Sequence, residues 1–331
     1  MSLASLGEFG LIEHIRGSFK TPGGITGIGD DCAVVPQRNG IDTLVSTDML
    51  IEGIHFIRED IRAKDLGWKS AAVNFSDIAA MGGVPTGTYL SIALPKDLEE
   101  IWVEEFIEGF REMSVLAASQ LPVGPTASGS LRCIPLLGGD TTASPGPICI
   151  NVTVTGECPH GRARLRSAAQ TGDFVCVTGT LGDSAAGLDI ILKGLKSCGE
   201  CTGHLLSRHY HPIPRIRESI SISRCEGVHA MMDISDGIAS DLGHILEASG
   251  KAAVIELENI PLSRELKTYC TQQGLDPLGL ATGGGEDYEL LFTLCPDADP
   301  GIAYTVIGRI TDGRGIEWKG SDRSYQGFRH F

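Results

Sequence analysis

The chain has 331 residues, 42% of them hydrophobic and 21% charged, which is typical of a globular protein of about two domains. The formal net charge is −15, and no basic run is available to bind nucleic-acid phosphates or an anionic membrane surface. The N-terminus has no signal-peptide pattern, and no stretch is apolar enough to span a bilayer. We therefore expect a cytoplasmic protein that binds neither nucleic acid nor membrane.

The first half alternates β-rich and helical patterns. A helix is predicted over 65–81, with Asp65 as its N-cap and Gly82-Gly83 as its end. Ser70, Asn74 and Asp77 share one polar stripe on this otherwise apolar helix, so we expect them to have buried partners. The other elements predicted here are strands 43–47, 89–94 and 148–156, a helix over 98–118 and a loop over 121–133.

The second half begins near Cys158 and repeats the mixture of strands and helices. The predicted strands are 174–179, 229–232, 253–257, 288–294 and 304–310, and the predicted helices are 184–193, 215–225 and 238–249, the last closed by Gly250. Mixed elements in both halves predict two α/β or α+β domains, residues 1–157 and 158–331. Periodicity alone does not fix their topology.

Acidic residues at strand ends and turns are the main chemical signal. Hydroxyl residues flank several of these acids, which are Asp30, Asp31, Asp48, Asp77, Asp140, Asp233 and Asp236. Carboxylate and hydroxyl oxygens are the ligands of hard cations, above all Mg²⁺. Two carboxylates about 4 Å apart repel by about 4 kcal/mol at an effective dielectric of about 20, so a converging set needs metal ions.

Each acidic motif also has a structural interpretation. Asp233, Ser235 and Asp236 could cap the helix that follows, and residues 140–142 could form a polar turn. A P-loop is excluded because no Gly-Lys-Ser/Thr string occurs. Gly27-Ile28-Gly29 lacks the third glycine of a dinucleotide fingerprint, because position 32 is Cys32.

The ten cysteines are too sparse for a disulfide scaffold, and reduced core thiols are expected. One cluster could instead bind zinc, although a complete structural site needs four rigidly held ligands. It consists of Cys198, Cys201, His204, His209 and His211. The alternative is a mobile loop followed by an ordinary His-Pro turn.

Eight ordered motifs resemble the thiamine-monophosphate kinase family, within the aminoimidazole-ribonucleotide synthetase-like superfamily. Together they extend over nearly the whole chain, and the ordered set is far more specific than any member. They are Gly-Ile-Gly-Asp-Asp-Cys-Ala (27–33), Ser-Thr-Asp-Met-Leu (46–50), Gly-Ile-His-Phe (53–56), Asn-Phe-Ser-Asp-Ile-Ala-Ala-Met-Gly (74–82), Gly-Gly-Asp-Thr-Thr (138–142), Val-Thr-Gly-Thr-Leu-Gly-Asp-Ser-Ala-Ala-Gly-Leu (177–188), Asp-Ile-Ser-Asp-Gly (233–237) and Gly-Gly-Glu-Asp-Tyr-Glu-Leu (284–290).

The resemblance implies Mg²⁺-dependent transfer of the ATP γ-phosphate to thiamine monophosphate, giving thiamine diphosphate and ADP. It implies an N-terminal sheet that forms a barrel across a homodimer, an α+β C-terminal domain, and nucleotide in the cleft between them. Phosphoryl transfer between phosphates needs positioning and charge neutralisation, and no general base is expected because the attacking oxygen is already ionised.

The resemblance also implies roles for individual residues. The expected metal ligands, for several Mg²⁺ ions, are Asp30, Ser46, Thr47, Asp48, Asp77, Asp140, Asp233 and Asp236. Gly139, Asp140, Arg166 and Ser235 are expected to contact ATP. His55, Glu286 and an aromatic residue near the C-terminus are expected to contact the acceptor, with Tyr325 favoured over Trp318.

Two departures from the family pattern accompany the resemblance. The segment 121–134 is longer than the family's usual run before Gly-Gly-Asp, and the string Trp318-Lys319-Gly320 is displaced upstream of the tail. Two other functional hypotheses remain: a sister enzyme of the superfamily with a different acceptor, and a cation-binding scaffold without catalysis.

Overall fold

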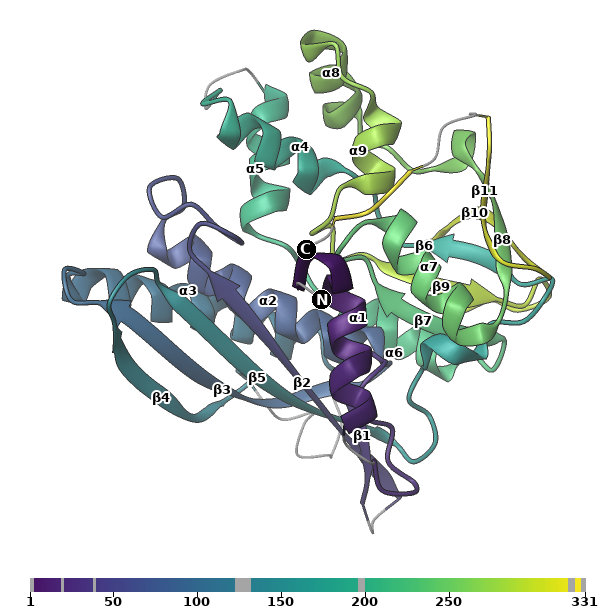
Figure 1. Ribbon diagram of the computed structural model, residues 1–331, viewed down its shortest axis with the longest axis horizontal. Helices are drawn as coiled ribbons and strands as arrows, with labels where there is room; N and C mark the ends of the chain where they lie inside the picture. Colours follow the sequence, from purple (N-terminus) through teal and green to yellow (C-terminus); the bar gives the residue numbers. More distant parts are fainter. Residues whose placement is uncertain are drawn as a thin grey trace.

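The computed structural model describes residues 3–18, 21–37, 40–122, 132–195, 200–320 and 325–328, without the side chains of 3–9 and 200. The chain forms two halves, each built on its own β-sheet, and the N-terminal helix α1 crosses in front of their junction (Figure 1). No helix in the described ranges combines the length and apolar character that crossing a bilayer requires.

A five-stranded sheet forms the first half, in the order β1-β2-β5-β3-β4. β4 runs parallel to β3, and the other neighbours are antiparallel. Helices α2 and α3 cover one face of this sheet (Figure 1). The elements are α1 (Leu3–Ser18), β1 (Ala33–Pro36), β2 (Ile41–Ile51), α2 (Ala63–Ala80), β3 (Val84–Pro95), α3 (Glu100–Ser119), β4 (Leu136–Ser144) and β5 (Cys149–Pro159).

Two glycines bring α2 and α3 into backbone contact. A Cβ atom at Gly67 of α2 would lie 1.9 Å from the carbonyl oxygen of Phe106, and one at Gly109 of α3 would lie 1.8 Å from that of Lys64. Only glycine permits such an approach, because any side chain would force the backbones apart. The close packing fixes the position of α2, which carries much of the site described below.

A six-stranded sheet forms the second half, in the order β11-β8-β10-β6-β9-β7. α7 and α6 pack on opposite faces of it, and α4, α5, α8 and α9 share a separate apolar core beyond its end (Figure 1). The elements are β6 (Phe174–Val177), α4 (Asp183–Leu192), α5 (Glu200–Tyr210), α6 (Ile216–Arg224), β7 (Val228–Asp233), α7 (Ile238–Ser249), β8 (Ala252–Glu256), α8 (Arg264–Gln273), α9 (Pro277–Gly283), β9 (Leu290–Leu294), β10 (Thr305–Thr311) and β11 (Gly315–Lys319).

The mixed α/β content of both halves confirms the expected fold class at this level. The described chain has no closed barrel, because β1 and β4 lie at opposite edges of the first sheet. Gly250 ends α7 in a left-handed conformation, as predicted. Most of the loop predicted over 121–133 lies outside the described residues.

One local prediction was wrong. Asp65 is not the N-cap of α2, which begins at Ala63; its carboxylate instead binds Arg62 and His211. The alternative interpretation of residues 140–142 as a polar turn does not hold either, because they lie inside strand β4. Sequence analysis also did not predict α1, β1, β4, α5, α8, α9 and β11.

Candidate active site

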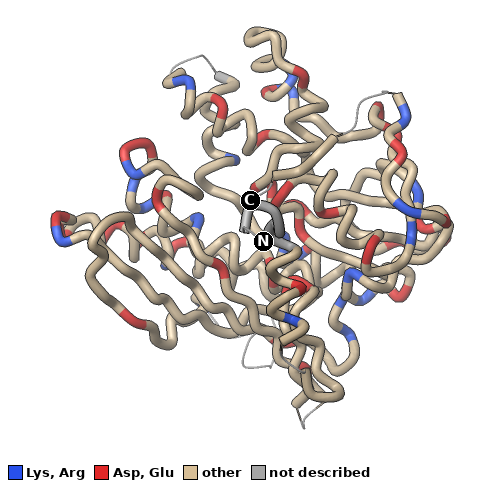
Figure 2. The backbone as a smooth tube through the Cα atoms, in the orientation of Figure 1, with Lys and Arg blue, Asp and Glu red and all other residues tan. Residues whose placement is uncertain are grey.

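Three acidic side chains converge where the two halves meet. Asp31 precedes β1, Asp77 lies on α2, and Asp233 ends β7. One carboxylate oxygen from each lies within 4.8 Å of the others. Red backbone segments lie close to the meeting point of the two halves in Figure 2. We refer to Asp31, Asp77 and Asp233 as the acidic cluster.

Hydroxyl groups hold two members of the acidic cluster in place. Ser46 of β2 donates to Oδ2 of Asp77 at 2.5 Å, and Ser76 of α2 donates to Oδ2 of Asp233 at 2.5 Å. The second bond joins the two halves of the chain. Ser46 and Asp77, which the motifs had associated with metal, therefore lie side by side in the structure.

The polar stripe on α2 has the partners that its burial requires. Ser70 donates to the carbonyl oxygen of Leu66, and the amide nitrogen of Asn74 donates to that of Ser70. The amide oxygen of Asn74 accepts the backbone N–H of Asp48 at 3.3 Å. The expectation of buried partners is confirmed, and Asn74 connects α2 to strand β2.

Burial dominates the electrostatics of this region. Burial and then the charge of neighbouring aspartates, Asp31 first, raise the pKa of Asp48 from 3.8 to about 6 and that of Asp233 to about 8. Burial followed by Asp48 and Asp233 raises the pKa of Asp77 well above its usual value. The pKa of Asp30 rises to about 6, again mainly through burial. Without cations, these carboxyls resist ionisation together.

Arg166 provides the positive charge at the edge of the acidic cluster. Its Nη2 lies 2.7 Å from Oδ1 of Asp31 and its Nε 3.3 Å from Oδ2, a two-point contact that raises the pKa of the guanidinium against the effect of burial. The backbone N–H of Arg166 donates to Asp30 at 2.8 Å. Arg166, expected at ATP, is thus bound to Asp31 in this structure.

The donor set of the acidic cluster suits a hard divalent cation. Three carboxylates supplemented by hydroxyl oxygens match the oxygen-rich coordination of Mg²⁺ and exclude a thiolate- or imidazole-based centre. Within the described residues, this is the one group of acids, histidines or cysteines that converges closely enough to hold a metal ion. Asp48 adds its carboxylate nearby, since its charge acts on both Asp77 and Asp233.

Asp140 and Thr47 are not brought to the acidic cluster. Pairing across the sheet places Met49 opposite Asn151, Asn151 opposite Ser91, and Ser91 opposite Asp140. Three strand spacings of about 4.8 Å put Asp140 roughly 14 Å from β2 within one chain. Gly139 shares this exposed strand.

The Thr47 side chain also makes its contact away from the acidic cluster. Its hydroxyl donates to the carbonyl oxygen of Val152, on the neighbouring strand β5, at 3.1 Å.

The segment after β7 does not serve as a helix cap. The N-cap of α7 is Gly237, and no side chain bonds to the end of the helix. The backbone N–H of Asp236 donates to Asp241 at 3.2 Å, and the carbonyl oxygen of Ser235 accepts the N–H of Glu286. Ser235 and Asp236 therefore lie between the acidic cluster and the turn that carries Glu286.

Glu286 makes its contacts with residues of both halves. Its carboxylate oxygens lie 2.9 Å from Nζ of Lys69, and Oε2 lies 3.3 Å from Nδ1 of His209. Burial alone would raise the pKa of Glu286, but the charge of the Lys69 ammonium outweighs it and lowers the pKa. The charge of His55 also lowers it, which places His55 near Glu286.

The two candidate aromatic residues near the C-terminus contact each other. The rings of Trp318 and Tyr325 meet edge to face, with centroids 5.2 Å apart. The backbone N–H of Phe328 donates to the carbonyl oxygen of Asp236 at 2.9 Å, so the end of the described chain passes beside the segment after β7. Residues 329–331 lie outside the described residues.

The zinc hypothesis has no support in the described residues. His204 contacts Asp183, His209 contacts Ser184 and Glu286, and His211 contacts Asp65, so the histidines serve different partners. Cys198 lies outside the described residues, and every described cysteine is a free thiol. The expectation of reduced cysteines holds for the described part of the chain.

Asp31 was among the acids that the sequence singled out, but the expected ligand set included Asp30 and not Asp31. The carboxylate that converges closely with those of Asp77 and Asp233 is that of Asp31. Sequence reasoning also passed over Lys69, whose side chain is 1% exposed. A lysine on a helix that is apolar around most of its circumference was a usable signal, because a buried ammonium needs an acidic partner.

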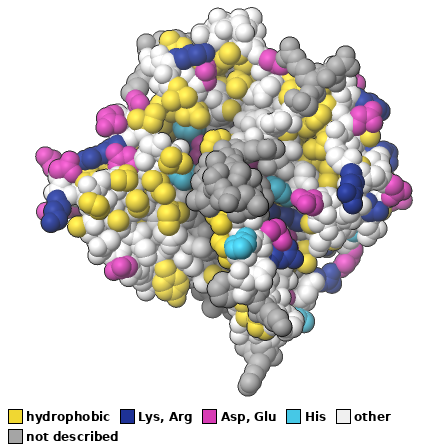
Figure 3. All heavy atoms as spheres, viewed as in Figure 1, with side chains coloured by type: hydrophobic (Ala, Val, Ile, Leu, Met, Phe, Trp, Pro, Cys, Tyr) yellow, Lys and Arg dark blue, Asp and Glu magenta, His cyan; other side chains and the backbone are white. Residues whose placement is uncertain are grey.

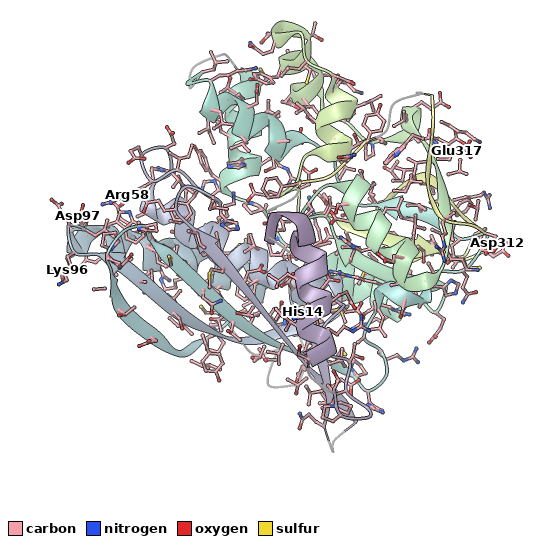
Figure 4. All side chains as sticks on the ribbon, viewed as in Figure 1. His14, Arg58, Lys96, Asp97, Asp312 and Glu317 are labelled. Carbon is pink, nitrogen blue, oxygen red and sulfur yellow. The ribbon has the colours of Figure 1, made fainter. Side chains whose placement is uncertain are left out.

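Charged residues at the outer edges of the molecule differ from those of the site in being exposed to solvent. Asp97 and Asp312 have side chains that are 74% and 82% exposed, and each pairs with a nearby basic residue. Figure 4 shows both far from the junction of the two halves. Such exposed ion pairs contribute little free energy and indicate no site.

Family models match both halves of the chain. Residues 29–158 match the model of the AIR synthase related protein, N-terminal domain, and residues 170–319 match the model of its C-terminal domain. The chain is 38% identical to the thiamine-monophosphate kinase of Aquifex aeolicus over 332 residues, which covers 100% of both chains. It is 37% identical to that of Escherichia coli K12, over 89% of this chain and 91% of the relative.

Solved structures agree with these sequence matches. The structure described as AaThiL complexed with AMPPCP and TMP has a TM-score of 0.89 and 37% identity, covering 100% of this chain and 99% of that one. Escherichia coli HypE, a hydrogenase maturation protein, has a TM-score of 0.63 at 18% identity, covering 87% of this chain and 84% of that one. This second likeness shows a common fold alone.

Proposed function

Because the chain belongs to the thiamine-monophosphate kinase family, we propose that it transfers the γ-phosphate of ATP to thiamine monophosphate, giving thiamine diphosphate and ADP. The observation that carries this proposal is the acidic cluster at the junction of the halves, with carboxylate oxygens within 4.8 Å. Two polyanionic substrates can approach such a site only when cations reverse its charge. Acids therefore suit this kinase better than a basic pocket would.

The residues of the cluster would hold Mg²⁺. Bound Mg²⁺ supplies charge neutralisation of the reacting phosphates. Asp31, Asp77 and Asp233 would be the first ligands, and Asp30, Asp48 and Asp236 would contribute further carboxylates. Ser46 and Ser76 fix the carboxylates of Asp77 and Asp233, which reduces the reorganisation needed on binding. Thr47 would be a further ligand.

Nucleotide and acceptor would lie on opposite sides of the segment after β7. Ser235 and Arg166 are assigned to ATP, and His55, Glu286 and Tyr325 to thiamine monophosphate. The guanidinium of Arg166 would then exchange part of its contact with Asp31 for phosphate oxygens, which its planar geometry also fits. No residue is assigned as a general base.

A homodimer would complete the site and close the barrel. β1 pairs only with residues 42–45 of β2, so in the described chain no strand covers that side of residues 46–51. β4 is the opposite edge, and both edges carry exposed apolar residues such as Met49, Leu136 and Leu137. Figure 3 shows hydrophobic atoms over this sheet. A second copy with β4 beside β2 would bring its Gly139 and Asp140 within one strand spacing of Thr47 and Asp48.

The division of the chain follows the same proposal. Residues 1–157 would form the metal-binding and dimerisation domain, and residues 158–331 the α+β domain, with ATP between them. A cytoplasmic location remains a prediction from sequence.

One assay tests the function. The full chain is incubated with ATP, Mg²⁺ and thiamine monophosphate, and thiamine diphosphate and ADP are quantified together. Equal amounts of both products support the proposal. ADP formed only with a different acceptor would point to a sister enzyme, and no turnover with any acceptor would favour a cation-binding scaffold. Sedimentation at micromolar concentration tests the dimer, which a monomeric mass would contradict.

A further inference from the structure

Lys69 of α2 carries an ammonium group that is almost completely buried, with 1% of the side chain exposed. A charge removed from water in this way needs a partner of opposite sign. The partner is Glu286 in the other half of the chain, whose two carboxylate oxygens each lie 2.9 Å from Nζ. One ion pair therefore connects the fixed helix α2 to the proposed acceptor residue.

The backbone around Glu286 is held in an unusual conformation. Glu286 and Tyr288 have φ values of 64° and 51°, in the left-handed region that glycine normally occupies. The N–H of Glu286 donates to Ser235, and Asp287 accepts the N–H of Gly182 at 2.8 Å. Such strain persists only where the surroundings enforce it, and it is common at ligand sites. The turn fixes the backbone, but it leaves the Glu286 side chain to its own partners.

His209 does not neutralise Glu286, although Nδ1 lies 3.3 Å from Oε2. Burial and then the charge of Lys69 lower the pKa of His209 to about 3, so its ring is neutral at physiological pH. The same ring nitrogen lies 3.1 Å from Oγ of Ser184. Lys69 therefore carries the positive charge in direct contact with Glu286.

We propose that Lys69 is a positioning residue for the acceptor, acting through Glu286. With Lys69 in place, the 27% exposed carboxylate keeps one orientation and presents little net charge to an incoming phosphate. Without it, Glu286 would be an unpaired anion beside an anionic substrate. The inference rests on the proposed function, because it takes thiamine monophosphate as the acceptor.

A double-mutant cycle tests whether Lys69 acts through Glu286. The variants are Lys69→Met, Glu286→Gln and their combination, with Lys69→Arg as the conservative change. Lys64→Met on the same helix is the matched control, since Lys64 pairs with Glu108 and Glu112 at the surface. We expect Lys69→Met to raise the KM for thiamine monophosphate about tenfold or more, with the KM for ATP within about twofold. Lys69→Arg should restore part of the loss, and Lys64→Met should match the wild type.

The combined variant gives the deciding comparison. If Lys69 acts through Glu286, Lys69→Met with Glu286→Gln should be no worse than Glu286→Gln alone, and this electroneutral pair should fold even if Lys69→Met does not. Additive losses, or equal losses toward ATP and acceptor, would overturn the inference. Calorimetry of thiamine monophosphate binding separates the two proposals: a wild type without turnover contradicts the function, whereas unchanged acceptor binding in the variants contradicts the role of Lys69.

Discussion

The buried carboxylate of Glu289 and those of the acidic cluster have pKa values shifted in opposite directions. Glu289 is fully buried, yet Arg208 and Arg215 both contact it and Thr178 donates to it at 2.7 Å. Burial alone would raise the pKa of Glu289, but Arg215 and Arg208 outweigh it and lower the pKa. In the acidic cluster, where Arg166 contacts Asp31 alone, the pKa of Asp233 rises to about 8.

The difference separates an acid whose charge the fold itself compensates from acids whose charge the fold leaves uncompensated. Glu289 has enough fixed cations and hydrogen bonds to remain ionised within the protein itself. The acidic cluster lacks them, so its full ionisation depends on cations supplied from solution. A buried acid whose charge the fold leaves uncompensated is the stronger indicator of a binding site.

The largest effect should come from removing the charge of Glu289, the buried acid that two arginines compensate. Glu289→Gln leaves Arg208 and Arg215 without their buried counter-charge, and we expect a loss of about 3–5 kcal/mol in unfolding free energy. Urea unfolding of the apo protein measures it. Lys319→Met, at an exposed ion pair with Glu256, serves as the control and should leave the midpoint unchanged. A loss below about 1 kcal/mol for Glu289→Gln would remove the contrast between the two sites.

Supplying cations should stabilise the uncompensated site. Mg²⁺ with ATP at about 100 times its Kd should add about 2.7 kcal/mol to the stability of the wild type by mass action. Asp77→Asn should lose most of that gain together with the kinase activity. Thermal melts with and without Mg²⁺-ATP give the comparison, and full stabilisation of the variant would remove Asp77 from the metal ligands.

The two sites should also respond to pH in opposite directions. Asp48 and Asp233 have folded pKa values of about 6 and 8, above the usual 3.8, so the folded state retains protons that the unfolded state has released. Apo stability should therefore fall as pH rises from about 4 to 8, by up to about 1.4 kcal/mol per pH unit for each such carboxyl. The contribution of Glu289 has the opposite sign, being lost as pH falls through its lowered pKa.

Melts in chelator across that pH range measure the net slope. Asp233→Asn should flatten it between about pH 6 and 8, because the carboxyl that titrates there is gone. Saturating Mg²⁺ should also flatten it. If the stability of the apo wild type instead rose with pH over this range, the interpretation of the acidic cluster as uncompensated would be contradicted.

The smallest effect concerns Asp77 in the absence of metal. Asparagine can still accept the hydrogen bond of Ser46, while the substitution removes one of the mutually repelling charges. We expect the apo form of Asp77→Asn to match the wild type or to exceed it by about 1 kcal/mol. A clear loss of apo stability would instead assign Asp77 a structural role, like that of Glu289.

The resemblance named Ser46, Asp77 and Asp233 among the expected metal ligands, and the structure brings these three side chains close together from three different elements. The position of Asp140 depends on the order of strands in the sheet, which no local pattern encodes. Nothing in the string 284–290 distinguishes Glu286 from Glu289, since their partners come from other helices.

The contacts between distant parts of the chain have a consequence for biogenesis. The bond from Ser76 to Asp233 spans 157 positions, and the pair of Lys69 with Glu286 spans 217. A chain still being synthesised can fold its first sheet and helices long before either contact exists. Until Asp233 has emerged, the nascent chain presents Asp31 and Asp77 without their third member. The three carboxylates of the acidic cluster can therefore come together only after Asp233 has been synthesised, so a cation held by all three cannot assist the folding of the first half before that point.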